Sequence, residues 1–422
     1  MSVTSVKTVQ AEGVSAIKSA EINVALESSR AINLEVTGDS SIPSHCQLPF
    51  KPEDHNLNPE FRLTKFGDIG GRGIKPDREE LQSLLSVFTE NQDDREGEQS
   101  ALEAPLCEET SVVRLDGFGL HLLETNNTLY PVIDDPYSMG KIACASVLSG
   151  IYALGIADCV TFRMILAVSN RMVDTERNVV IPLIIRGFRD VAKSVETVVR
   201  NVQLLTNPWC LIGGTATAIC STRELVPPDG STVGDVIVLT KPLGTMVAVN
   251  IAHWMELPER RNRLLITITE DDAKKAHSRA IDSMARTNRV AAVLMRKYNA
   301  HAACDISSHG ILGHAHMLAK KQKNSVSFVI HNMPVIAKIS GTCKVMGNVM
   351  PLLQGYMPEV SGGLLVVLPR EQAAAYCKDL EKTEHRQAWI IGIVEYGKRT
   401  ARVIDRPRVI DVPAKETGAS LW

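Results

Sequence analysis

Apolar residues recur along the chain with two different spacings, and these spacings predict which segments are strands and which are helices. Short apolar runs that are bounded by glycine, threonine or charged residues are typical of strands. Such runs occupy residues 119–126, 210–220, 234–244, 325–330, 363–368 and 387–397. Because helical segments alternate with these runs, the pattern as a whole predicts an α+β fold.

An apolar helix is predicted after Asp135, which is placed to cap it and is followed by Pro136 in the first turn. Gly155 supplies the expected end of this helix. Carboxylates such as Asp134 and Asp135 are also metal ligands, and this interpretation stays open beside the cap. The helix contains the longest apolar stretch, residues 142–157, which is shorter than the ~20 residues of a membrane span.

Further helices are predicted behind other capping side chains. Thr269 and the acidic residues after it predict one long helix over residues 269–298, since the helix dipole favours acids in the first turn. Residues 77–88 place several apolar side chains on one helical face behind Asp77. Residues 299–321 have the pattern of a strand, a loop and a helix.

Changes in composition divide the chain into five segments. Residues 1–58 are rich in Ser, Thr, Val and Glu without sustained periodicity, which predicts a disordered extension. Residues 59–105 hold a glycine-rich arm and a helix. Two folded domains are predicted over residues 106–225 and 226–413, and residues 414–422 form a tail.

The composition argues against several classes of protein. The 422 residues carry a net charge of −2, so no general attraction to nucleic acid or to a membrane surface is expected. Nine cysteines are scattered without a CxxC pair, which indicates a reducing compartment and no zinc cluster. The N-terminus lacks a basic start followed by an apolar run. We therefore expect a soluble, cytoplasmic protein.

Residues 66–76, FGDIGGRGIKP, form a glycine-rich segment that leads to Lys75. A loop of this kind can cradle phosphate groups with its backbone N–H groups and bring a lysine to them. A flexible linker is the alternative interpretation of the motif taken alone. No Walker A pattern occurs in the chain, which argues against a P-loop ATPase.

From residue 61 to about residue 412 the chain resembles the selenophosphate synthetase (selenide, water dikinase) family. The stretches that carry the resemblance include NPEFRLTKF, YPVIDDPYSMGKIACA, GDVIVLTKPLGT, HNMPV, SGGLL and QAWIIGIVE. The chain is most similar to the eukaryotic form that has neither selenocysteine nor cysteine at the catalytic position. The resemblance implies a homodimer with the two-domain synthetase fold of certain purine-biosynthesis enzymes. In that fold the N-terminal α/β half helps to form an intersubunit barrel, and the C-terminal half is α+β.

The resemblance also implies a reaction in which ATP, selenide and water give selenophosphate, AMP and phosphate. The family's glycine loop carries selenocysteine or cysteine, then glycine, cysteine and lysine. The matching positions here are Arg72, Gly73, Ile74 and Lys75. Lys75 keeps a cation for the phosphate oxygens, whereas Arg72 is expected to bind an anion because it has no nucleophilic thiol. The expected ligands are ATP and either selenide or another small anion.

Four positions match metal-binding aspartates of the family, which hold Mg²⁺ on the triphosphate. Asp305 is retained, and Glu109 keeps the charge with one more methylene. Asn127 offers an oxygen without charge, and Gly150 offers no ligand. We expect Asp305 and Glu109 to be metal ligands, and Glu109, Asn127 and Lys75 to lie at the nucleotide. Binding of ATP and Mg²⁺ should be weakened, because Mg²⁺ requires several oxygen ligands in a strict geometry.

A family loop that approaches ATP falls at residues 200–204, where only Gln203 is retained as a nucleotide-binding candidate. Asn201 and Val202 replace two glycines, which opposes a close approach of the backbone to a nucleotide. Four histidines gather further along the sequence, at positions 301, 309, 314 and 316. Packing is the favoured role for them, because a metal site requires convergent ligands and two of them lie two apart on a predicted helix.

Two functions from different classes remain open. One is an ATP-dependent phosphotransferase of the selenophosphate synthetase family whose selenide-dependent activity is weak or lost. The other is a catalytically impaired paralogue that acts as a regulatory or binding subunit, as a homodimer or as a heterodimer with an active relative.

Overall fold

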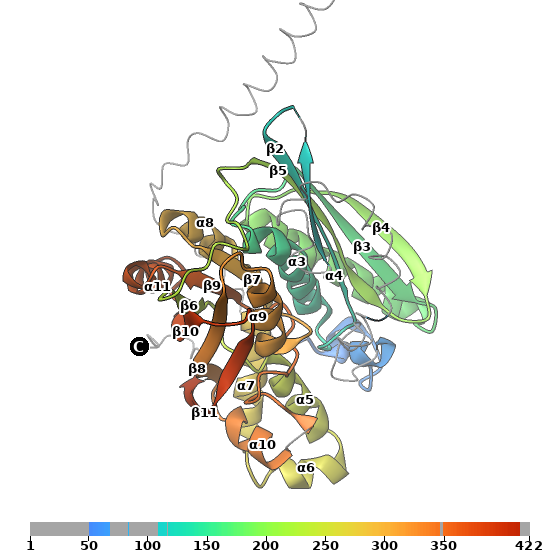
Figure 1. Ribbon diagram of the computed structural model, residues 1–422. Helices are drawn as coiled ribbons and strands as arrows, with labels where there is room; N and C mark the ends of the chain where they lie inside the picture. The colour runs from blue at the N-terminus through green and yellow to red at the C-terminus, as the bar shows by residue number, and fades with distance from the viewer. Residues whose placement is uncertain (1–49, 68–82, 84–108, 116, 347–348, 414–422) are drawn as a thin grey trace, which may run out of the picture. The chain divides into compact units, whose positions relative to one another are not determined.

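Two mixed sheets lie in the part of the chain that the structure describes (Figure 1). The structure is a computed structural model, and it describes residues 50–67, 83, 109–115, 117–346 and 349–413. All of these residues belong to one unit, which begins at Leu48. The unit is α+β, as the sequence predicts.

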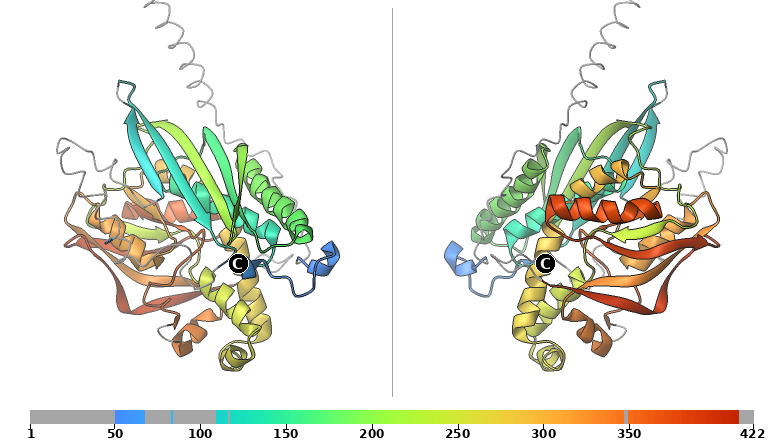
Figure 2. Two further views of the ribbon diagram at one scale, coloured as in Figure 1. Left: turned by 90° about the vertical axis from the view of Figure 1, so that its right-hand side faces the viewer. Right: turned by 90° about the vertical axis from the view of Figure 1, so that its left-hand side faces the viewer.

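The first sheet has the strand order β1-β2-β5-β3-β4. Its strands are β1 (Thr110–Leu115), β2 (Leu120–Leu129), β3 (Thr161–Ser169), β4 (Val199–Asn207) and β5 (Leu211–Ser221). Neighbouring strands are antiparallel except β3 and β4, which are parallel. The helices α3 (Pro136–Ala153) and α4 (Asp174–Ser194) pack against each other and cover one face of this sheet (Figures 1 and 2).

The second sheet has the order β11-β8-β10-β6-β9-β7. Its strands are β6 (Val236–Leu239), β7 (Ala302–Asp305), β8 (Val326–Ile336), β9 (Leu364–Leu368), β10 (Trp389–Tyr396) and β11 (Ala401–Val412). β8 and β11 are parallel, and the other neighbouring pairs are antiparallel. Each of the six runs that the pattern assigns to strands contains or overlaps a strand of one of the two sheets.

Helices pack around the second sheet. They are α5 (Thr245–Met255), α6 (Pro258–Leu264), α7 (Glu270–Ala285), α8 (Arg289–Lys297), α9 (Gly310–Lys320), α10 (Ile339–Met346) and α11 (Arg370–Glu384). α9 packs on β7, β8 and β11, whereas α11 packs on β6 and β10 and against α8 (Figure 1). Two short 3-10 helices, Pro52–His55 and Leu63–Phe66, precede the first sheet.

Helix α3 lies between the two halves of this unit. It contacts β2 and β5 of the first sheet and also α7, α8 and β7 of the second half. Residues 142 to 153 are buried without exception, so the apolar stretch that is too short to span a membrane is instead a core helix. No helix among the described residues is long and apolar enough to cross a membrane.

The start of α3 confirms the capping prediction. The Asp135 carboxylate accepts hydrogen bonds from the backbone N–H groups of Tyr137 and Ser138, at 3.0 and 3.3 Å. Asp134 has a different task, because its Oδ1 accepts both the N–H and the hydroxyl of Thr64, at 2.9 and 2.8 Å. Asp134 thereby ties the segment that leads into the glycine loop to the root of α3.

The predicted long helix over residues 269–298 is wrong in one respect, because the segment is two helices. Thr269 caps α7 as expected, since its hydroxyl accepts the Asp272 N–H at 3.1 Å. Arg286 then turns to extended backbone, with φ −78° and ψ 135°, and α8 begins three residues later. The break is stabilised by tertiary contacts of Arg286 and Asn288, which no local sequence pattern predicts.

Two further expectations need correction. Residues 50–58 were expected in a disordered extension, but they contain a 3-10 helix and Leu57 is buried. Residues 200–204, where the family resemblance implies a loop, lie inside strand β4. Val202 suits an extended strand better than the glycine it replaces, because it is β-branched. The predicted helix over residues 77–88 and the tail lie outside the described residues, and the domain boundaries stay predictions.

Candidate functional site

One side of α3 faces the positions where the family resemblance implies carboxylates. The Asn127 Nδ2 group donates to Ser146 Oγ at 2.9 Å, so this amide points at the helix. One helical turn later Gly150 lies against the buried threonines of β1 and β2. A Cβ atom added at Gly150 would lie 2.3 Å from Thr110 Oγ1 and 2.7 Å from Thr125 Oγ1. The site is therefore closed around a glycine, and a larger residue requires its neighbours to move.

Glu109 lies at the start of β1, directly before Thr110. Its backbone carbonyl accepts the Asn126 N–H at 2.8 Å, which brings Glu109 beside the β2 segment that carries Asn127. On the far side of Asn127, β5 approaches closely, since a Cβ atom on Gly213 would lie 1.9 Å from the Asn127 carbonyl oxygen. Glu109, Asn127 and Gly150 thus gather at one place between β1, β2 and α3.

The other side of α3 is bonded to the second half of the unit through Asn288. The Asn288 Nδ2 group donates to Ser149 Oγ at 3.1 Å and to the Gly362 carbonyl at 3.0 Å. Asn288 lies in the break between α7 and α8, and it is buried. Because Ser149 precedes Gly150, this contact brings residues 361–363, which we call the 361–363 turn, next to the same part of α3.

The backbone around Asp305 packs against the 361–363 turn. It ends strand β7 and pairs with Leu364 of β9. The next residue, Ile306, donates its N–H to the Gly363 carbonyl at 3.0 Å, and a Cβ atom on Gly362 would lie 2.4 Å from the Ile306 carbonyl oxygen. Both glycines of the SGGLL motif are therefore explained by close backbone packing. Asn288 and the 361–363 turn link Asp305 to Ser149, on the side of α3 that faces the second half of the unit.

The histidines near Asp305 have structural partners. His314 is buried in α9, and its Nε2 accepts the backbone N–H groups of Ser307 and His309 at 3.1 and 3.4 Å. This ring nitrogen thereby satisfies donors at the start of the helix, which is a packing role. His301 pairs instead with Asp235, with 2.8 Å between Nδ1 and Oδ2.

Glu359 is a buried carboxylate that the sequence analysis missed. Its oxygens accept the N–H groups of Gly244 and Thr245, at 2.5 and 2.9 Å, and the Thr245 hydroxyl. Its own N–H donates to the Ser307 carbonyl, so it also borders the loop after Asp305. Burial raises the pKa of Glu359 to about 7, and these hydrogen bonds oppose the rise. Glu359 caps the start of α5. The sequence gave no signal of this role, because Glu359 is a lone acid beside a motif of small residues.

The root of the glycine loop lies at the end of β2. A Cβ atom on Gly67 would lie 3.0 Å from Cδ of Pro131, only a few residues beyond Asn127, and the Phe66 carbonyl accepts the Cys210 N–H at 2.7 Å. Arg72 and Lys75 lie outside the described residues. The segment that carries them thus starts beside the site, and eight residues of chain from Gly67 to Lys75 can span up to about 25 Å.

Gln203 does not join this group. Across the first sheet Asn127 pairs with Gly214, Gly214 with Met164, and Met164 with Val202. Three strand spacings of roughly 4.8 Å therefore separate the β2 position from the neighbour of Gln203. Gln203 is exposed on β4, at the edge of the sheet. Its nucleotide-binding role stays a prediction.

Among the described residues, few oxygen donors are placed where the family resemblance implies a magnesium ion. The candidate donors are two carboxylates, Asp305 and Glu109, and the Asn127 amide, whose nitrogen is bonded to Ser146. Within the described ranges, three or more Cys, His, Asp or Glu residues nowhere gather as they would around a metal ion. Mg²⁺ takes six oxygens in near-octahedral geometry, so we assign no chemical step to it here.

The chain is similar to known proteins along most of its length. Selenide, water dikinase 3 of Danio rerio is 44% identical over 404 residues, a match that covers 88% of this chain and 90% of the relative. Selenide, water dikinase 2 of Homo sapiens is 45% identical over 401 residues, covering 88% of this chain and 89% of the relative. The chain belongs to the selenide, water dikinase family.

Two further matches describe the fold of this family member. Residues 232–405 match the model of the AIR synthase related protein, C-terminal domain. The hydrogenase maturation protein HypE, solved in complex with ATP, aligns with a TM-score of 0.50 and 15% identity, over 81% of this chain and 94% of that chain. The AIR synthase-like fold that the resemblance implies is therefore confirmed.

Proposed function

We propose that this selenide, water dikinase family member retains a nucleotide site between the two sheets and has weak or no selenide-dependent activity. The site lies around Glu109, Asn127, Gly150 and Asp305, and Lys75 would approach it from the root of the glycine loop. ATP is the proposed nucleotide, because the relatives are named as dikinases and HypE of similar fold was solved with ATP.

The observation that carries the loss of activity is the packing at Gly150. The buried hydroxyl groups of Thr110 and Thr125 crowd this position, so that a side chain there requires the threonines to move. The neighbouring Asn127 is neutral. Glu109 and Asp305 are therefore the two carboxylates that provide negative charge facing a triphosphate. Together with Arg72 and Ile74, which replace thiol-bearing residues in the loop, this leaves neither a soft nucleophile nor a full cation shell.

The alternative is a regulatory or binding subunit, which the same losses support. A protein that folds like an enzyme but lacks its ligands can still bind a nucleotide, a small anion or an active relative. The exposed face of the first sheet supports a dimer for either of these two functions.

Calorimetry with ATP tests the nucleotide part of this proposal. We expect weak binding whose affinity rises less than about tenfold when Mg²⁺ is added, since two carboxylates are too few to fix the metal rigidly. Asp305→Asn should remove the increment that remains. Tight binding that depends on Mg²⁺ by more than a hundredfold would mean that other groups complete the shell, and the proposed impairment would be wrong.

A further inference from the structure

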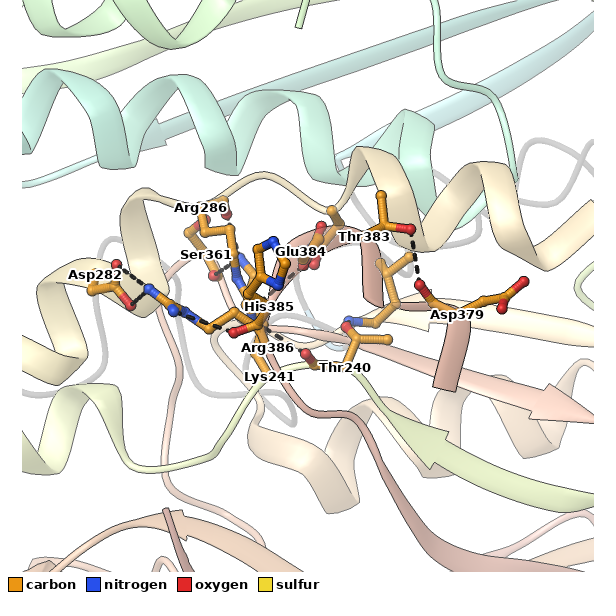
Figure 3. A network of polar contacts seen from close by, with 12 residues as sticks. Thr240, Lys241, Asp282, Arg286, Ser361, Asp379, Thr383, Glu384, His385 and Arg386 are labelled. Atoms are coloured by element: carbon orange, nitrogen blue, oxygen red, sulfur yellow. Dashed lines mark hydrogen bonds and ion pairs between the residues drawn. The ribbon is translucent and has the colours of Figure 1, made fainter. Parts of the chain in front are cut away.

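Lys241 is a buried lysine bonded to segments that border the proposed site, and the sequence analysis did not single it out. It follows strand β6, and only 1% of its surface is exposed. Its Nζ donates to the carbonyl oxygen of Arg286 at 2.5 Å and to that of Ser361 at 2.9 Å. Figure 3 shows Lys241 together with Arg286 and Ser361 in a network of polar contacts.

The two acceptors of Lys241 flank the contact that builds the site. Arg286 lies two residues before Asn288, and Ser361 directly precedes Gly362. The Asn288 side chain and the Gly362 carbonyl are the pair that joins the α7–α8 break to the 361–363 turn. Lys241 therefore bonds the same two segments a second time, through the carbonyl groups of Arg286 and Ser361.

The backbone of Lys241 also touches the 361–363 turn. A Cβ atom on Gly363 would lie 2.5 Å from the Lys241 nitrogen, so the two main chains pack without a side chain between them. Ser361 has φ 46°, in the left-handed region that residues other than glycine rarely adopt. A bond to its carbonyl helps to hold this strained conformation.

Charged neighbours surround the ammonium group (Figure 3). Arg286 donates to Glu384 at 2.9 Å and to the Thr240 carbonyl at 3.2 Å, and Arg386 contacts Asp282. Burial and the Arg286 charge hold the pKa of Lys241 well below its usual range, against the attraction of Glu384, Asp282 and Asp305.

We propose that Lys241 is a positioning residue for Asp305, acting through the Arg286 and Ser361 carbonyl groups that fix the 361–363 turn. Asp305 and Ile306 pack against this turn. If the turn became more mobile, the Asp305 carboxylate would move away from α3. The role in ligand binding rests on the proposed nucleotide site, whereas the effect on the turn does not.

The test compares Lys241→Met with Gln322→Met. Gln322 is an equally buried side chain of the same half, and it bonds the Ser231 N–H and the Pro228 and Leu318 carbonyls, none of which belongs to the 361–363 turn. Amide hydrogen exchange is measured at Ile306 and at Ser231. Lys241→Met should speed exchange at Ile306 at least tenfold and leave Ser231 protected, and Gln322→Met should do the reverse. Asn288→Ala provides a second route to the same loosening of Ile306 if Lys241→Met does not fold.

ATP calorimetry on the same variants then separates a positioning role from general weakening. In the presence of Mg²⁺, Lys241→Met and Asn288→Ala should lower ATP affinity by as much as Asp305→Asn does, and Gln322→Met should not change it. Protection of Ile306 that survives in Lys241→Met would overturn the inference, and so would loosening without any loss of ATP affinity. A wild-type protein that binds no ATP at all would instead refute the proposed nucleotide site, while hydrogen exchange would still decide the effect on the turn.

Discussion

Replacing Gly150 by aspartate is expected to lower the free energy of unfolding by about 3 kcal/mol or more, and not to restore a metal ligand. The new Cβ atom would lie 2.3 Å from Thr110 Oγ1, and both neighbouring threonines are buried. Overpacking of this kind costs about 1–3 kcal/mol, and burying an unpaired carboxylate costs several more. Urea unfolding of the purified variant measures the loss.

Gly150→Ala and Gly341→Ala make a matched pair for this prediction. In an exposed helix interior, alanine is favoured over glycine by about 1 kcal/mol. Gly341 in α10 has open space, since the nearest atom to an added Cβ lies at 4.0 Å, and alanine there should stabilise the protein. At Gly150 the crowding should reverse the sign. If both alanine variants were stabilised equally, the threonines would have room to move and the packing argument would be wrong.

Aspartate at both Val113 and Ile219 is expected to convert a dimer into a monomer. Val113, Leu122 and Ile219 pair in one row across β1, β2 and β5. Val113 and Ile219 are 50% and 46% exposed, whereas the next row, Val112, Leu123 and Ala218, is buried against the helices. Such an apolar row on the open face of a sheet is what an intersubunit barrel of the family would cover.

The size of this effect follows from the burial of charge. Two unpaired carboxylates inside an interface cost several kcal/mol, and each 1.4 kcal/mol is a factor of ten, so the dissociation constant should rise more than a hundredfold. Sedimentation at micromolar concentration should show a wild-type dimer and a variant monomer. Val345→Asp is the control, since this α10 residue is 51% exposed and lies outside the first sheet. A wild-type monomer, or a variant that stays dimeric, would place the subunit contact elsewhere or remove it.

Much of the fold could be predicted because its signals are local. Asp135 and Thr269 bond N–H groups two or three residues away, so a cap is visible in the sequence before the helix is seen. Strand runs such as residues 234–244 carry their own apolar pattern and turn residues. These features depend on neighbours in the chain, and the structure confirms them.

The rest could not be predicted because its partners are distant in the sequence. The break after Arg286 depends on Lys241, which lies 45 residues before it, and on the bond from Asn288 to Gly362, 74 residues later. The family resemblance indicates which residue replaces an aspartate at position 150, but only the structure places Thr110 and Thr125 against it. The contacts of the Glu359 side chain are non-local in the same way, because its oxygens accept hydrogen bonds from donors more than a hundred residues earlier.

The conversion of ATP in the presence of selenide tests the central claim most directly. The purified protein is incubated with ATP and Mg²⁺ under reducing conditions, with and without selenide, and AMP and selenophosphate are quantified by phosphorus NMR. We expect at most a small rise of AMP above the selenide-free control and little or no selenophosphate. Sustained formation of selenophosphate with equal AMP would show that Arg72, Asn127 and Gly150 are compatible with the family reaction, and the claim of weak or lost activity would be wrong.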